Sequence, residues 1–133
     1  MTRIIKAFIA IFFFSTTVSA MASEMSYTCE VKHVYSLSGD GSLNISNWDK
    51  DMRGSSFSVS RETGQIIGEV VPTLMAKGTG VVNKGSTQNS FKAWADFGNQ
   101  LQLIEVQEFK EGTIKPFVSA SMGGAGIVTG VCK

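Results

Sequence analysis

The feature that most restricts the fold of this chain is a pair of cysteines, Cys29 and Cys132, placed towards the two ends of the sequence. The chain has no other cysteine with which either could pair. A bond between them would make the beginning and the end of the folded domain neighbours. In an oxidising compartment such a pair forms a disulfide, whereas in a reducing compartment both stay free thiols. The compartment therefore decides between the two alternatives.

The N-terminus predicts export. Arg3 and Lys6 give a positive start, which is followed by the apolar run Ala7–Phe14 and the small, polar stretch Ser15–Ala20. This order is the three-part pattern of a secretory signal. A membrane anchor, the alternative, needs about 20 apolar residues, and this run is too short.

We therefore expect a signal peptide over residues 1–20 and a single mature domain over residues 21–133. The mature domain should be periplasmic or extracellular, with no membrane span. Because that compartment is oxidising, the sequence favours a disulfide between Cys29 and Cys132.

The charges of the mature chain argue against two classes of partner. Without Arg3 and Lys6, the 12 basic residues fall to 10, against 11 acidic ones. The remaining charges alternate in sign and form no block. A nucleic-acid binder needs a basic stripe, and so does a polybasic membrane-binding face. We expect neither.

Alternating side chains predict strands through the mature chain. Residues 27–36 form the first expected strand, and its inward face should carry every second residue. The turn Ser38–Ser42 follows, and residues 55–60 and 91–97 alternate in the same way. In residues 101–110 the apolar phase shifts between Leu103 and Ile104, which predicts a bulge. The residues expected on the inward face of the first strand are Tyr27, Cys29, Val31, His33 and Tyr35.

About eight such strands follow one another at spacings of about 8 to 12 residues, which is typical of an all-β sandwich or barrel. The first and last strands carry the cysteines, and these strands are neighbours if the sheet closes. The sequence therefore favours a small antiparallel barrel, with a two-sheet β-sandwich as the alternative.

No catalytic or metal-binding group is evident. His33 is the only histidine, and no serine lies in a nucleophile-elbow pattern. Asp49–Gly54 begins like a calcium loop, but Arg53 and Ser60 stand where the loop needs an oxygen ligand and a glutamate. We expect a protein that is not an enzyme and holds neither a metal nor a cofactor.

Exposed aromatic residues are the better candidates for function. Trp48 lies in a polar segment, Trp94 on the charged face of its strand, and Phe117 at a strand entry. A tryptophan outside the core is a common anchor in protein interfaces. The alternative is that each tryptophan covers one end of the core and that Phe117 is an ordinary strand entry. These residues favour a binding module that acts on a protein or envelope component through exposed loops, particularly Ser46–Gly54 with Trp48. His33 is a further candidate, with a local hydrogen bond at the end of its strand as the alternative.

A carrier of small apolar ligands is the alternative function. The barrel interior would then be lined by Phe57, Phe91 and Phe97 and would contain a cavity. An interior filled by side chains would contradict this hypothesis.

Tyr27-Thr28-Cys29, together with Cys132 and the overall size, resembles the small periplasmic inhibitors of C-type lysozyme, which are eight-stranded barrels. The Ser-Gly-x-x-Tyr and Trp-x-Lys-Gly motifs of that family have no counterpart in this chain. The nearest match, Trp48-Asp49-Lys50, is followed by Asp51. We therefore carry over no site from that family.

Overall fold

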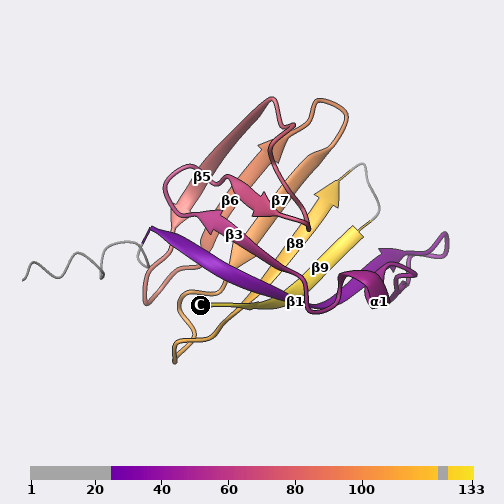
Figure 1. Cartoon of the computed structure of the whole chain (residues 1–133), viewed down its shortest axis with the longest axis horizontal. Coiled ribbons are helices and arrows are strands. Elements are labelled where there is room, and N and C mark those ends of the chain that lie inside the picture. Colours follow the sequence, from indigo (N-terminus) through magenta and orange to yellow (C-terminus); the bar gives the residue numbers. More distant parts are fainter. Residues whose placement is uncertain (1–24, 123–125) are drawn as a thin grey trace, which may run out of the picture.

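The computed structural model describes residues 25–122 and 126–133. The expected signal peptide, residues 1–20, lies outside the described residues. Nearly all the regular structure is β-strand (Figure 1). The elements are β1 (Ser26–Leu37), β2 (Leu43–Ile45), α1 (Asp49–Met52), β3 (Ser56–Ser60), β4 (Ile66–Gly68), β5 (Gly78–Lys84), β6 (Phe91–Asp96), β7 (Leu101–Val106), β8 (Lys115–Met122) and β9 (Gly126–Cys132).

The strands form one antiparallel sheet in the order β4-β3-β1-β9-β8-β7-β6-β5, and β2 pairs with β1 beside this path. The sheet curls around its core but does not close, since β4 and β5 remain its two ends (Figure 1). The prediction of an all-β, antiparallel, barrel-like fold is confirmed, with the correction that the barrel is open.

The first and last strands are neighbours in the sheet, and the disulfide joins them as expected. Cys29 and Cys132 lie directly opposite each other on β1 and β9 and are bonded, with 1% and 0% of their surface exposed. A disulfide is typical of proteins kept in a non-reducing environment.

The core fills the concave side of the curled sheet. Two edge-to-face aromatic pairs lie there: Tyr27 with Phe91, at 5.3 Å between ring centroids, and Phe57 with Phe117, at 5.2 Å. The Phe117 ring packs over Gly130 of β9, where a Cβ would lie 2.6 Å from the ring. A glycine at this position therefore makes room for the aromatic core.

A bulge in β1 changes which side chains face the core. The pairing of β1 with β9 shifts between Val31 and His33. Beyond the shift the inward residue is Val34, which is 5% exposed, and His33 faces outward. The expectation of unbroken alternation, with His33 and Tyr35 on the inner face, is therefore wrong, because the extra residue reverses the phase.

The bulge expected in β7 is absent. β7 pairs with β6 and with β8 without a register shift from Leu101 to Val106. Gln102 and Ile104 face the core, and Leu101 and Leu103 face outward, with 40% and 43% of their surface exposed. Gln102 stays inside because its side-chain amide donates to the Val71 carbonyl at 2.9 Å.

The gap between the two ends of the sheet is bridged by the β3–β4 turn rather than by a strand ladder. The Thr79 hydroxyl on β5 donates to the Thr63 carbonyl at 3.0 Å. The Arg61 guanidinium donates to the Lys84 carbonyl at 3.1 Å. These bonds hold the sheet curled without completing the barrel.

Candidate functional site

The end of β1 pairs with β2, and beyond Tyr35, which also pairs with Ile127 of β9, these two strands continue as a ribbon past the rest of the sheet (Figure 1). Leu37 lies opposite Leu43, and Tyr35 lies opposite Ile45. Residues directly opposite each other, and every second residue along a strand, share one face of a sheet. We call the surface made by Tyr35, Leu37, Leu43 and Ile45 the ribbon face.

The ribbon face is apolar and open to solvent. Leu37, Leu43 and Ile45 are 62%, 52% and 54% exposed, while Tyr35 is partly buried. The opposite face carries the polar pair Ser36 and Asn44. Large apolar side chains gathered on one protruding element are unusual on a surface that contacts only water.

The turn that makes the ribbon is encoded locally. The Ser38 amide donates to the Ser42 carbonyl at 2.8 Å, which closes the hairpin. The Asp40 carboxylate accepts from the amide and hydroxyl of Ser42, at 3.0 and 2.6 Å, and these bonds lower the pKa of Asp40. Gly41 follows with φ of 85°, a conformation that glycine adopts without strain. The Asp-Gly turn expected from the sequence is therefore present.

The segment between β2 and β3 covers the part of β1 that has no strand on that side. The Ser46 amide donates to the Val34 carbonyl, and the Gly54 amide donates to the Val31 carbonyl. The helix α1 lies between these contacts, and Trp48 immediately precedes it. Trp48 is 67% exposed, so the expectation of an exposed tryptophan in this segment is confirmed.

Asp49 holds this segment to β1. Its side chain is 2% exposed, and Oδ1 accepts the Val34 amide at 2.8 Å. Oδ2 pairs with the Arg53 guanidinium, and His33 Nδ1 lies 3.7 Å from Oδ1. These contacts hold the pKa of Asp49 below its usual range. The hydrogen bond from the Val34 amide has the largest lowering effect, followed by Arg53 and His33. The carboxylate that resembled a calcium ligand therefore acts as a structural anchor.

The other aromatic candidates differ in their surroundings. Trp94 is partly buried because its indole covers Gly80, where a Cβ would lie 2.7 Å from Nε1. Phe117 is 3% exposed and belongs to the core, so the expectation that it forms an exposed anchor is wrong. On β8 the Phe117 side chain faces the core, and its cross-strand partner is Gly130. His33 is exposed beside Asp49.

One row of outward-facing residues joins Trp94 to the ribbon face. Direct cross-strand pairs connect neighbouring strands along this row from β6 to β2. Since paired residues share a face, all of them lie on the convex side of the sheet. The row consists of Trp94, Leu103, Ala120, Ile127, Tyr35 and Ile45.

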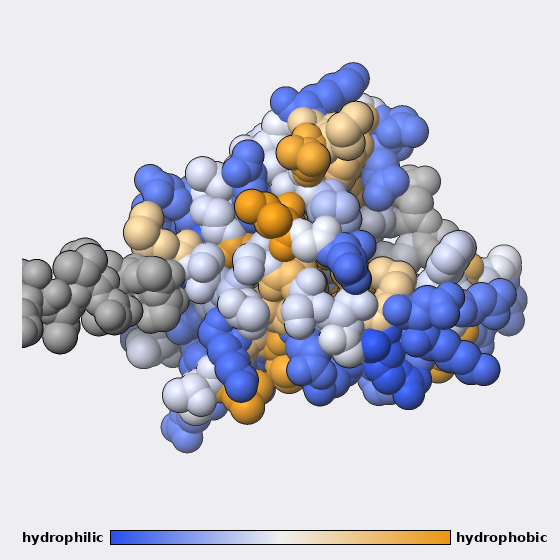
Figure 2. Space-filling model, in the orientation of Figure 1, coloured by the Kyte–Doolittle hydropathy of each residue, from blue (hydrophilic) through white to orange (hydrophobic). Residues whose placement is uncertain are grey.

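The face drawn in Figure 2 carries both hydrophilic and hydrophobic side chains. Figure 2 looks onto β3, β4 and α1, and there the hydrophobic surface is divided into small separate patches. Hydrophilic side chains cover the region of α1. The apolar ribbon face is thus followed in the chain by a polar segment around α1.

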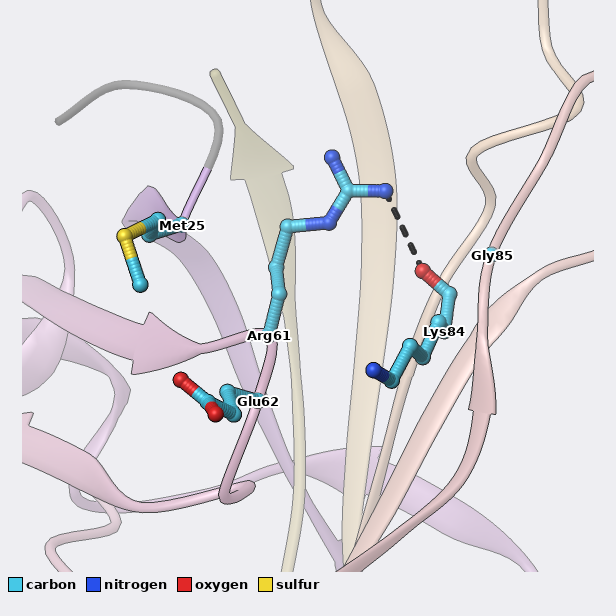
Figure 3. Close-up of a pocket in the computed structure, with 5 residues that line it drawn as sticks. All are labelled: Met25, Arg61, Glu62, Lys84 and Gly85. Carbon is cyan, nitrogen blue, oxygen red and sulfur yellow. Dashed lines mark hydrogen bonds between the residues drawn. The ribbon is translucent and has the colours of Figure 1, made fainter. Parts of the chain in front are cut away.

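A cleft of about 450 Å³ opens beside the β3–β4 turn, between Met25, Arg61, Glu62, Lys84 and Gly85 (Figure 3). The Arg61 guanidinium lies over the Tyr27 ring, 4.8 Å from its centroid, and donates to the Lys84 carbonyl. Arg61 therefore already has partners that bridge the gap in the sheet, and the side chains of Glu62 and Lys84 carry opposite charges. The geometry fits a structural bridge better than a site for a charged ligand.

The interior offers little room for a ligand in the described part of the chain. Phe57 and Phe91 are buried against other aromatic rings, and Phe97 is only partly buried. The space lined by residues such as Ile66 and Ile104 does not admit a water-sized sphere. The cavity that a carrier of small apolar ligands requires is not seen among these residues.

Within residues 25–122 and 126–133, no three His, Cys, Asp or Glu side chains are grouped as metal ligands would be. The same ranges contain no helix long and apolar enough to cross a membrane. Comparison with protein-family models, curated proteins and solved structures finds no match to this chain.

Sequence reasoning identified Trp48 but missed the ribbon face, which precedes it in the chain. The pattern Leu43-Asn44-Ile45 is too short to stand out as a strand. The signal that could have revealed it is the Asp40-Gly41 turn, because a hairpin turn pairs the residues on its two sides. Pairing across it places Leu43 opposite Leu37.

Proposed function

We propose that this protein is an exported, non-enzymatic binding module that docks onto a protein or cell-envelope component through the ribbon face and Trp48. The observation that carries the proposal is that Leu37, Leu43 and Ile45, each more than half exposed, share one face of the projecting ribbon. Trp48, which is 67% exposed, follows Ile45 three residues later in the chain. Export is supported by the N-terminal pattern and by the disulfide.

The construction of the site favours docking because hydrogen bonds hold the segments that carry the apolar side chains. Asp49 fixes the segment that carries Trp48, and the hydrogen-bonded Ser38–Ser42 turn fixes the ribbon. A preorganised surface loses less conformational entropy on binding than a flexible one. Tryptophan and large aliphatic side chains also provide the apolar centre that typical interfaces have.

The test is capture of a partner by the immobilised, oxidised mature protein from an extract of the host's envelope and medium. The variant Leu43→Lys with Ile45→Lys places two charges on the ribbon face without touching the core. We expect recovery of the partner to fall at least about tenfold, which corresponds to about 1.4 kcal/mol of binding free energy.

The matched control is Ile67→Lys, which changes another apolar side chain that is 74% exposed but lies on β4. This control should capture as much partner as the wild type. Equal recovery by all three proteins, or an equal loss in the control, would overturn the assignment of the ribbon face.

A further inference from the structure

We propose that the free edge of β2 pairs with β2 of a second copy of this chain, so that two sheets join around a twofold axis at Asn44. This inference goes beyond the proposed function, because the partner is the same chain. The contact is also different, since it uses the backbone edge of the ribbon rather than its apolar face.

The register of the hairpin shows which backbone groups are free. The Ser38 amide bonds to the Ser42 carbonyl, and the Ser46 amide bonds to the Val34 carbonyl. Hydrogen-bonded pairs alternate along an antiparallel ladder, so the amide and carbonyl of Asn44 point towards β1. Those of Leu43 and Ile45 consequently point away from β1, and within residues 25–122 and 126–133 the sheet order places no strand there.

This edge lacks the usual protection against pairing. Natural edge strands carry lysine, proline or a bulge, or lie under a loop. Residues 41–48 include no charged residue and no proline. By contrast, β4 is covered, because Thr73 bonds to both the amide and the carbonyl of Ile66. The unprotected edge of β2 is therefore the surface on which another strand can add.

β2 itself meets the requirements of this edge. In an antiparallel pair centred on Asn44, Leu43 of each copy lies opposite Ile45 of the other, and each such pair exchanges two backbone hydrogen bonds. Apolar side chains then meet apolar side chains. Asp40 falls opposite Trp48, so no like charges oppose each other. An interface that uses the same patch on both copies is the form that most homodimers take.

The dimer also has a consequence for the proposed docking surface. A twofold axis perpendicular to the sheet leaves both ribbon faces on the same side. The two copies would thus present one continuous apolar surface of twice the size, with a Trp48 beyond each end of the paired strands. Because β2 is short, the association should be weak and concentration-dependent.

Sedimentation equilibrium of the oxidised mature protein over a range of concentrations tests the inference. The variant Ile45→Pro removes the free-edge donor but no hydrogen bond to β1, because the Ile45 amide points away from that strand. Two bonds are lost per dimer, so the dissociation constant should rise at least about fivefold. The matched control Ile45→Thr keeps the amide and should weaken the dimer less than proline does.

The outcomes separate this inference from the proposed function. A wild type that stays monomeric at every concentration overturns the dimer, and so does an Ile45→Pro variant that dimerises like the wild type. An unfolding curve of Ile45→Pro checks whether the variant is folded. If Ile45→Pro is not folded, amide hydrogen exchange of the wild type is measured instead. Exchange at Leu43 and Ile45 that slows as the protein concentration rises supports the dimer, and unchanged exchange contradicts it. Partner capture by a monomeric wild type supports the proposed function alone.

Discussion

Reduction of the Cys29–Cys132 disulfide is expected to lower the free energy of unfolding by up to about 4.7 kcal/mol at 25 °C. The two cysteines are 103 residues apart, so the bond restricts nearly the whole unfolded domain. In the chain-entropy model, a disulfide that closes a loop of this length lowers the conformational entropy of the unfolded state by about 16 cal/mol/K. The loss is a large share of the roughly 5–15 kcal/mol that stabilises a typical domain.

The measurement is urea unfolding of the mature protein in its oxidised form and after reduction, followed by tryptophan fluorescence. A variant with Cys29→Ala and Cys132→Ala is the control for the thiols themselves, since both side chains are buried. It should unfold near the reduced wild type, with a further loss from the missing sulfur atoms. A difference below about 1 kcal/mol between the oxidised and reduced forms would refute the argument that the bond acts by closing a long loop.

Four further variants test the site and the core. Asp49→Asn should make the free energy of unfolding fall less steeply at acid pH. The lowered pKa of Asp49 stabilises the folded protein above the unfolded pKa of about 3.9, and this stabilisation is lost as pH falls through the folded pKa. Acid-unfolding curves that are the same for the variant and the wild type would contradict this. Phe117→Ala should cost about 3–5 kcal/mol in urea unfolding, whereas Trp48→Ala should stay within about 0.5 kcal/mol; equal costs would contradict the burial of Phe117. Gly130→Ala should destabilise the fold because a Cβ there meets the Phe117 ring and the Glu30 carbonyl, and calorimetry that shows no fall in Tm would show that β9 can shift.

The sequence was informative about strands, the turn and the disulfide because each depends on local pattern or on compartment. Period-two alternation identified β3 and β6, and the Asp40-Gly41 pair identified the hairpin turn. The cysteines could be paired because there are only two. These signals do not depend on how the sheet curls, which is why the general fold could be predicted.

The bulges could not be located from the sequence. An extra residue in β1 reverses the phase after Val31, although the alternation Tyr27, Cys29, Val31, His33 reads as unbroken. In β7 the opposite happened: a buried Gln102 made a regular strand look shifted. Its burial depends on the Val71 carbonyl, 31 residues away, and no local pattern reports such a partner.

The exposure of the aromatic candidates could also not be read from their neighbours in sequence. Phe117 follows Pro116 and a lysine, which suggested a surface, but its alternation on β8 turns it towards Gly130 and the core. Trp94 lies on the outer face as its charged neighbours indicated, yet Gly80 on the adjacent strand lets the ring lie flat and partly buried. Cross-strand neighbours decided both cases.

The central claim, that the ribbon face binds a partner, is tested most directly by position-specific photo-crosslinking in the host. A crosslinking side chain at Leu43 lies on the ribbon face, and one at Ser58 lies at an exposed position of β3. We predict a discrete adduct, larger than two copies of this chain, from position 43 and none from position 58. No adduct from Leu43, or the same adduct from both positions, would contradict the account.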